Sequence, residues 1–201
     1  LGAAEFHQEH WAEADKWLAE SLAVKPLWRR ADETLLLQSR VQQRLNRVAD
    51  AQQTARRVIA EFPMSKLLDQ AHYRIGEYAY GDNDLKTAAT EYMVVVTKYP
   101  ESSFFAYARY GLGWCQLKSK EFAPAVESFS QLLAKSPDHP LANDARMARG
   151  MARRQTGDQA GAIEDFAAYL KTNPPVEQKS HVLYERGLAE VAKQYFVGAV
   201  A

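Results

Sequence analysis

The chain has 201 residues and carries 25 Lys and Arg against 25 Asp and Glu, so its formal net charge is zero. A neutral chain lacks the positive charge typical of general nucleic-acid or anionic-membrane binders, and we expect no nucleic-acid partner. The single cysteine, Cys115, excludes an intrachain disulfide and a cysteine-based zinc site. No apolar stretch approaches the roughly 20 residues that span a bilayer, so we expect no membrane insertion by this segment.

A period of 37 residues runs through the chain and is its most informative feature. Proline, alanine, glycine and large apolar residues each recur at this interval and form columns when the chain is written in rows of that length. Glycine inside a helix costs about 1 kcal/mol relative to alanine, so a recurring glycine indicates that two helix axes approach closely. The columns are Pro26, Pro63, Pro100, Pro137 and Pro174; Ala14, Ala51, Ala88, Ala125, Ala162 and Ala199; Gly2, Gly76, Gly113, Gly150 and Gly187, interrupted by Ser39; and Leu18, Ala55, Tyr92, Phe129 and Phe166.

This period predicts a single repeat array over 1–201. It consists of a partial repeat over 1–26, full repeats over 27–63, 64–100, 101–137 and 138–174, and a partial repeat over 175–201. Gly2 falls in the middle of a first helix and Ala201 inside a second one. We therefore expect both ends to cut through a repeat and the array to be a fragment of a longer protein.

In the first partial repeat, the sequence HQEHW at 7–11 falls at the turn between two helices. His7 and His10 flank Glu9 there, but the zinc-protease arrangement of two histidines separated by three residues is absent. A solvated turn is therefore favoured over a metal site.

The repeat over 64–100 shows the two-helix pattern most clearly. Apolar residues from 65 to 80 recur with the period of a helix, and Ser65 is the expected N-cap. The sequence GDND at 81–84 favours a turn, and Asp84 is placed to cap a second helix that runs to about Lys98. Pro100 closes the repeat because proline cannot continue that helix.

The next two repeats follow the same plan. We expect Ser102 or Ser103 to begin the first helix of 101–137, and KSKE at 118–121 to form the turn. Pro124 is compatible with the second helix, because proline in a first turn gives up only an N–H without an intrahelical partner. In the repeat over 138–174, QTGDQ at 155–159 supplies the turn.

The pattern resembles the tetratricopeptide repeat, a helix–turn–helix unit with Leu-Gly in its first helix, small and aromatic residues in its second and a closing proline. The segment 110–137 carries these features at Leu112, Gly113, Phe122, Ala125, Phe129, Leu132 and Pro137. The resemblance implies an all-α fold, a right-handed superhelical α-solenoid of stacked helix–turn–helix repeats. It also implies a concave surface lined mainly by the first helix of each repeat.

The period is three residues longer than the usual 34 of this family, and the extra residues follow the proline. The strings AEFPMSKLLDQAHYRIGE and TKYPESSFFAYARYGLGW resemble one branch of the family. That branch includes the periplasmic coordinator of the Tol–Pal system and the lipoprotein of the outer-membrane barrel-assembly machinery. This resemblance favours a periplasmic or envelope-associated location in a bacterium and leaves a cytoplasmic one open.

The resemblance also places partner-binding residues on the first helices, around the glycine column. They form an aromatic and methionine-rich strip with few charges, suited to an extended or helical peptide of another protein. The predicted partner-binding residues are Gln70, Tyr73, Glu77, Tyr80, Tyr107, Tyr110, Trp114, Asp144, Met147, Met151, Arg154 and Tyr184.

Three of these residues, Tyr107, Trp114 and Met151, are expected to be the more exposed. Another group shares one column and is compatible with core packing as well as with partner contact: Tyr73, Tyr110, Met147 and Tyr184. Family members that bind chaperone C-termini hold the terminal carboxylate with a Lys, Asn and Arg clamp. The matching positions here are Glu77, Trp114 and Met151, so that activity is not expected.

One local excess of basic residues stands out in this neutral chain. Arg40, Arg44 and Arg47 can share one helix face, and Arg56 and Arg57 follow in the next helix. The cluster faces either solvent, which is favoured, or an acidic partner or phosphates.

The sequence contains no glycine-rich phosphate loop, nucleophile elbow or paired-carboxylate motif. We therefore expect no catalytic residues, no cofactor and no metal. The prediction is a non-catalytic scaffold that binds a peptide or protein partner on its concave surface, in bacterial cell-envelope assembly. The alternatives are a docking or regulatory segment of a larger enzyme or secretion complex, and a glycan-binding surface, because exposed Tyr and Trp also stack on sugars.

Overall fold

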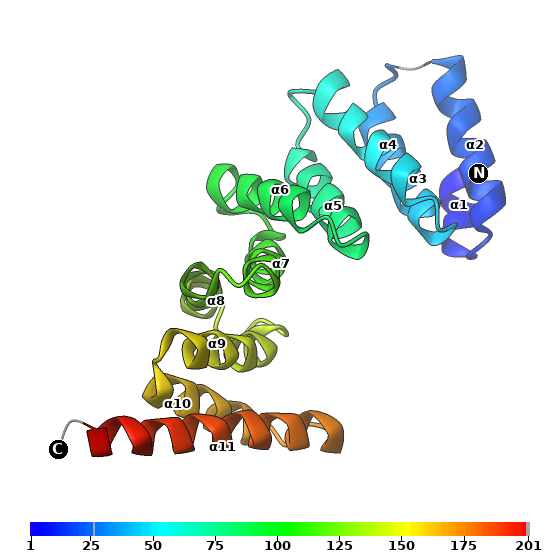
Figure 1. The fold of residues 1–201 in the computed structure, drawn as a ribbon. Helices are drawn as coiled ribbons and strands as arrows, with labels where there is room; N and C mark the ends of the chain where they lie inside the picture. Colours follow the sequence, from blue (N-terminus) through cyan, green and yellow to red (C-terminus); the bar gives the residue numbers. More distant parts are fainter. Residues whose placement is uncertain (26, 200–201) are drawn as a thin grey trace. The chain divides into compact units, whose positions relative to one another are not determined.

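The computed structural model describes residues 1–25 and 27–199, with side chains as far as Gln194. Pro26 and Ala201 lie outside the described residues, as does the side chain of Ala199. Throughout the described part the regular structure is α-helical (Figure 1). The helices are α1 (Gly2–His7), α2 (Trp11–Val24), α3 (Ala31–Arg44), α4 (Val48–Glu61), α5 (Leu68–Gly81), α6 (Leu85–Lys98), α7 (Phe105–Lys118), α8 (Phe122–Lys135), α9 (Ala142–Thr156), α10 (Gln159–Leu170) and α11 (Val176–Ala199).

The chain forms two compact units, Leu1–Phe104 and Phe105–Ala201. Within each unit, consecutive helices pack against each other as antiparallel hairpins. The hairpins α3–α4, α5–α6, α7–α8 and α9–α10 lie within residues 27–63, 64–100, 101–137 and 138–174 respectively. The predicted all-α fold of stacked helix–turn–helix units is confirmed.

The glycine column has the packing role that the sequence predicted. In the α7–α8 hairpin, a Cβ atom on Gly113 would lie 2.6 Å from Cε1 of Phe129, and the neighbouring repeats show the same approach of Gly76 to Tyr92. Small residues in the second helix complete this close crossing. Ala14, Ala51, Ala88, Ala125 and Ala162 are all fully buried.

The turn inside each repeat contains a feature that the sequence analysis missed. One residue in each of five turns has a positive φ, and these residues are again 37 apart: Glu9 (62°), Asn46 (59°), Asn83 (60°), Lys120 (63°) and Gly157 (88°). The residue after each one donates its N–H to a carbonyl of the preceding helix, as from Glu121 to Gln116 at 2.8 Å. This left-handed helix ending closes the first helix and starts the second.

Replacing Lys120 with glycine is expected to raise the free energy of unfolding by about 1 kcal/mol, because a non-glycine residue in the left-handed region costs about 1–2 kcal/mol. Urea unfolding followed by circular dichroism would measure the gain. The control is Glu127→Gly at an exposed position in the middle of α8. This substitution is expected to lower the free energy of unfolding by about 1 kcal/mol. A loss in both variants would contradict the strain assigned to the turn.

The predicted N-cap role of Ser65 is wrong, because α5 begins at Leu68 after an N-cap at Leu67. The Ser65 hydroxyl accepts a hydrogen bond from the Leu67 N–H at 3.1 Å and donates one to Asp32 of the preceding repeat at 2.6 Å. Ser102 likewise precedes its helix, α7, and donates to Asp69 at 2.5 Å. Within the first unit, Ser65 therefore links the start of α5 to α3 of the preceding repeat.

The last partial repeat also differs from the prediction. Ala201 was expected inside a second helix, which requires a turn at 192–195 as at the equivalent positions of the preceding repeats, but α11 continues as one helix from Val176 to Ala199. The residues at the turn position, 192–195, contain no glycine, asparagine or aspartate that would favour a break. A Cβ atom on Gly187 would meet no described atom within 4 Å, unlike the other glycines of its column.

Candidate functional site

The predicted partner-binding residues all lie on first helices: α5, α7, α9 and α11. Those on α5 belong to the unit 1–104, where Tyr73 is held in place by its neighbours. Its ring stacks on Phe104 at a centroid distance of 4.9 Å, and its hydroxyl donates to Glu77 at 2.9 Å. Gln70 and Tyr80 are half-buried on the same helix. The α5 positions therefore present fixed edges of side chains rather than freely exposed rings.

In the second unit, Tyr107 is 40% exposed. Its ring packs edge-on against the ring of His139, with 4.7 Å between the ring centroids. Burial lowers the pKa of His139, so this imidazole is neutral at pH 7. Tyr107 thus combines an exposed aromatic surface with a fixed orientation.

Trp114 and Met151, which were expected to be exposed, are half-buried instead. Trp114 packs against Phe129 at 6.3 Å between ring centroids, beside Tyr110, and Met151 packs with Met147 on the core around Phe166. A helix surface in a repeat array is covered partly by the next repeat, which a helical period alone does not show.

The remaining predicted residues differ in their surroundings. The Arg154 guanidinium donates to Glu185 at 2.8 Å, and this ion pair joins α9 to α11. Tyr184 is 64% exposed on α11, and Asp144 is half-buried. Arg154 is therefore engaged in the fold, whereas the ring of Tyr184 is exposed.

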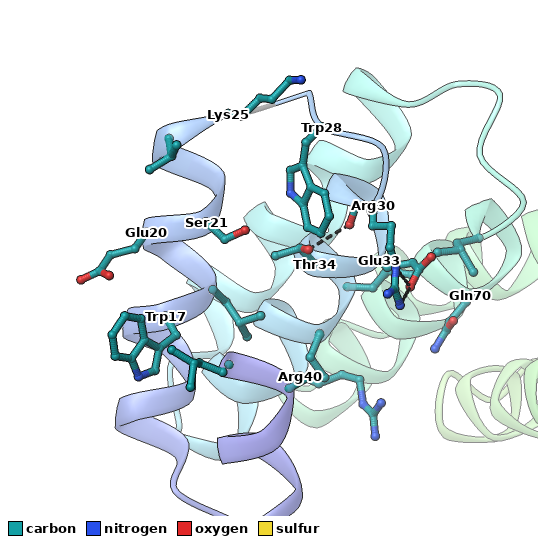
Figure 2. A pocket seen from close by; sticks show the side chains of 18 residues that line it. Trp17, Glu20, Ser21, Lys25, Trp28, Arg30, Glu33, Thr34, Arg40 and Gln70 are labelled. Carbon is teal, nitrogen blue, oxygen red and sulfur yellow. Dashed lines mark hydrogen bonds and ion pairs between the residues drawn. The ribbon is translucent and has the colours of Figure 1, made fainter.

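A cavity of about 1050 Å³ lies among α1, α2 and α3 in the first unit (Figure 2). Trp17 and Trp28 line it, with the Arg30–Glu33 ion pair at its edge, 2.6 Å long. Trp17 is 37% exposed, whereas the residues at the equivalent position of the other repeats are exposed by 8% or less: Thr54, Glu91, Ser128 and Asp165. Sequence patterns did not indicate this cavity.

A smaller cavity of about 360 Å³ lies between α3 and α5. Arg40, Arg44 and Arg74 line it together with Glu77 and Tyr78. Its arginines come partly from the basic cluster noted in the sequence and partly from the predicted partner-binding helix α5. Only the fold brings these two groups together.

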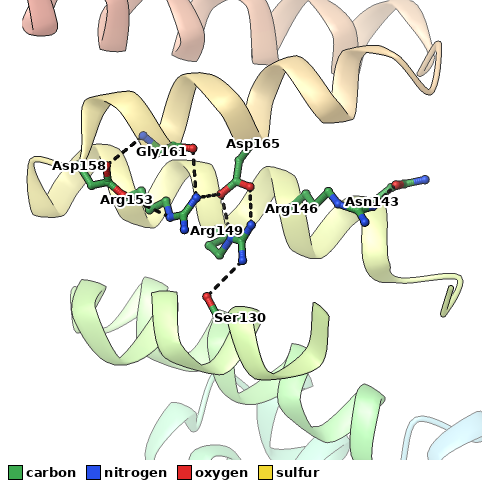
Figure 3. Close-up of polar contacts among 8 residues, drawn as sticks. All are labelled: Ser130, Asn143, Arg146, Arg149, Arg153, Asp158, Gly161 and Asp165. Atoms are coloured by element: carbon green, nitrogen blue, oxygen red, sulfur yellow. Dashed lines mark hydrogen bonds and ion pairs between the residues drawn. The ribbon is translucent and has the colours of Figure 1, made fainter. Parts of the chain in front are cut away.

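A polar cluster is buried between α9 and α10 (Figure 3). Asp165 is 4% exposed and accepts hydrogen bonds from Arg149 at 2.6 and 2.8 Å and from Arg153 at 3.0 Å. Arg149 also reaches Ser130 of α8 at 3.3 Å. These contacts connect three successive helices, so we assign the cluster to the stability of the hairpin.

Two further findings bear on chemistry. Burial raises the pKa of the Cys115 thiol to about 11, so at neutral pH it is a packed thiol and not a thiolate nucleophile. Within the described part of the chain, no group of three or more His, Cys, Asp or Glu could hold a metal ion.

None of the described helices combines the length and apolar character needed to cross a membrane.

The repeated hairpins, the glycine–aromatic crossings and the proline ends agree with one family. A family model described as tetratricopeptide repeat matches residues 36–103 and 110–177, which is more than half of the chain. The chain belongs to the tetratricopeptide repeat family. The two matched segments lie almost entirely within one unit each, so both units of this tetratricopeptide repeat protein carry the family pattern.

Solved structures share the fold of this tetratricopeptide repeat protein. A tetratricopeptide repeat protein from Parabacteroides merdae is 13% identical, with a TM-score of 0.77 over 98% of this chain and 76% of that chain. A crystal structure of MamA is 18% identical, with a TM-score of 0.74 over 90% and 97% of the two chains. A form of MamA from Desulfovibrio magneticus is also 18% identical, with a TM-score of 0.71 over 85% and 89%. No curated protein matches the chain.

Proposed function

We propose that this chain is a non-catalytic scaffold that binds a peptide segment of another protein on the surface of its first helices. Tetratricopeptide repeat domains are protein-interaction modules, and this membership supports a binding role in place of catalysis. The observation that carries the proposal is Tyr107, an exposed ring held edge-on against His139 on a first helix. Tyrosine in such a position provides a large contact area at little cost in conformational entropy.

A finer proposal places this scaffold in the assembly of a bacterial cell envelope. Its support is the Pro-x-Ser sequence that follows each of two repeats, at Pro63–Ser65 and Pro100–Ser102, as in the envelope-associated branch. Immunoblotting of periplasmic and cytosolic fractions of the native bacterium would test it. Recovery in the cytosol alone would exclude the envelope role and leave the scaffold function unaffected.

Peptides selected by phage display against the whole chain, then titrated by calorimetry, would test the binding surface. Tyr107→Ala is expected to lower the affinity for a selected peptide by about tenfold or more, because an aromatic anchor contributes roughly 2 kcal/mol to binding. The control is Met93→Ala, an exposed apolar residue of the second helix α6 that is expected to leave affinity unchanged. Equal affinity of the wild type and a folded Tyr107→Ala variant would refute this surface.

The same calorimeter separates the glycan alternative from peptide binding. Titration with peptidoglycan fragments is expected to release no heat. Heat with glycans that disappears in Tyr107→Ala, together with no binding of any displayed peptide, would replace the proposed function with glycan binding.

A further inference from the structure

The five arginines of the basic cluster have different roles in the structure. Arg47 pairs with Asp15 at 2.5 Å and with Asp50 at 2.8 Å, so it links two repeats. Two more are also paired within the fold: Arg56 with Glu91 at 3.1 Å and Arg57 with Glu61 at 2.7 Å. By contrast, Arg40 and Arg44 form no ion pair or hydrogen bond with any described residue. These two are the ones that line the 360 Å³ cavity.

Aromatic rings orient both guanidinium groups. The Arg40 guanidinium carbon lies 4.7 Å from the centre of the Phe6 ring, and that of Arg44 lies 5.8 Å from the Trp11 ring. Stacking on a ring covers the face of a guanidinium and leaves the N–H groups at its edge available. The two arginines are thus positioned donors without an acceptor among the described residues.

The third arginine of the cavity comes from α5. Arg74 donates from Nη1 to Glu77 at 2.5 Å, while its Nε is buried and has no hydrogen-bond partner among the described residues. A buried donor without an acceptor is unfavourable, so part of the hydrogen-bonding capacity of Arg74 is unused among the described residues.

The charge balance of the cavity favours an anion. Its lining contains three arginines and one carboxylate, that of Glu77, and both oxygens of this carboxylate are already used by Tyr73 and Arg74. Burial, together with the nearby Arg74 cation, lowers the pKa of Arg40. A role at the helix end accounts for Arg44, which lies in the last turn of α3, but not for Arg40 or Arg74 in the middle of their helices.

We propose that Arg40, Arg44 and Arg74 form a site for a phosphate group carried by a side chain of the protein partner. The lining has a formal charge of +2, which a phosphate of about −2 neutralises and a single carboxylate does not. Guanidinium forks also match phosphate oxygens in pairs, and arginine clusters recognise phosphorylated segments in other proteins. The inference rests on the proposed function, because Arg74 lies on a helix of the proposed binding surface.

The test uses the whole chain, immobilised, and three libraries of short peptides that differ only at a central phosphoserine, serine or glutamate. The phosphoserine library is expected to be retained about tenfold more than the serine library, a preference that weakens as salt is raised. Arg40→Gln combined with Arg44→Gln is expected to abolish this preference. The matched control is Arg57→Gln, an arginine of the same basic cluster that is paired with Glu61 and lies outside the cavity, and it should retain the preference.

Other outcomes would overturn the inference, and they separate it from the proposed function. Equal retention of the three libraries, still dependent on Tyr107, would remove the phosphate site and leave the scaffold function intact. Retention of the glutamate library equal to that of phosphoserine would replace the phosphate with an acidic peptide. Binding of inorganic phosphate or of a single-stranded oligonucleotide, with no preference among the peptides, would exclude a phosphorylated protein partner.

Discussion

Replacing Asp165 with alanine is expected to lower the free energy of unfolding by about 3–5 kcal/mol. The carboxylate is almost completely buried between α9 and α10 and accepts hydrogen bonds from Arg149 and Arg153. Its removal leaves the partly buried Arg149 without this carboxylate and leaves Arg153 with Asp158, 3.3 Å away, as its ion-pair partner. Uncompensated charge in a poorly solvated position is among the most destabilising changes that a single substitution can cause.

Hydrogen exchange read by mass spectrometry would locate this loss, because a repeat array need not unfold in one step. Peptides from α9 and α10 are expected to lose protection first. Glu164→Ala, an exposed neighbour on α10, serves as the control and should change stability by less than about 0.5 kcal/mol. A loss in Asp165→Ala no larger than that of the control would show that the cluster contributes little.

A second comparison separates charge from packing in the same cluster. Replacing Arg149 and Arg153 with methionine and Asp165 with leucine removes all three charges together. Such a replacement of a buried ionic cluster by apolar residues is often neutral or stabilising. We therefore expect the triple variant to be more stable than Asp165→Ala, and a triple variant that is less stable would refute the assignment of the loss to uncompensated charge.

The second large effect concerns the glycine column. Replacing glycine with alanine is expected to lower the free energy of unfolding at one position of the column and to raise it at another. Gly113→Ala places a Cβ atom 2.6 Å from both Cε1 and Cζ of Phe129, a fully buried ring that would have to shift. Overpacking of this kind costs about 1–3 kcal/mol. Gly187→Ala meets no described atom and is expected to gain up to about 1 kcal/mol from helix propensity.

Chemical denaturation of the two variants and the wild type would measure both changes. The gain in Gly187→Ala shows the benefit of removing a glycine from a helix, so the difference between the two variants isolates the contact with Phe129. A gain at both positions would show that the crossing in the α7–α8 hairpin is loose enough to accept a methyl group.

Much of the fold could be predicted because a repeat of helix pairs rests on local signals. Helix periodicity, turn residues and the closing proline act over a few residues, and they placed the four hairpins and the Asp84 cap, which accepts from the Thr87 N–H at 3.1 Å. The left-handed turn residue was missed because its identity varies among Glu, Asn, Lys and Gly while its backbone conformation is constant. Ser65 was misassigned because its acceptor, Asp32, belongs to the preceding repeat.

The candidate site could be predicted only in part. The first-helix surface follows from the repeat, but the exposure of each side chain depends on the neighbouring helix, so Trp114 and Met151 are half-buried while Tyr107 is exposed. The proposed phosphate site likewise depends on how neighbouring repeats pack. Arg40 and Arg74 are 34 positions apart in the sequence and line one cavity only because their helices pack side by side.

The sequence by itself determined that this protein is an array of helix hairpins, because 37-residue spacing of small residues and prolines leaves one local structure that satisfies every repeat. Tertiary structure alone decided which charged residues are used by the fold and which are left for a ligand. The reason is that ion pairing depends on the geometry between neighbouring helices. It engages Arg47, Arg56 and Arg57 in the fold and leaves Arg40 and Arg44 stacked on aromatic rings without an acidic partner among the described residues.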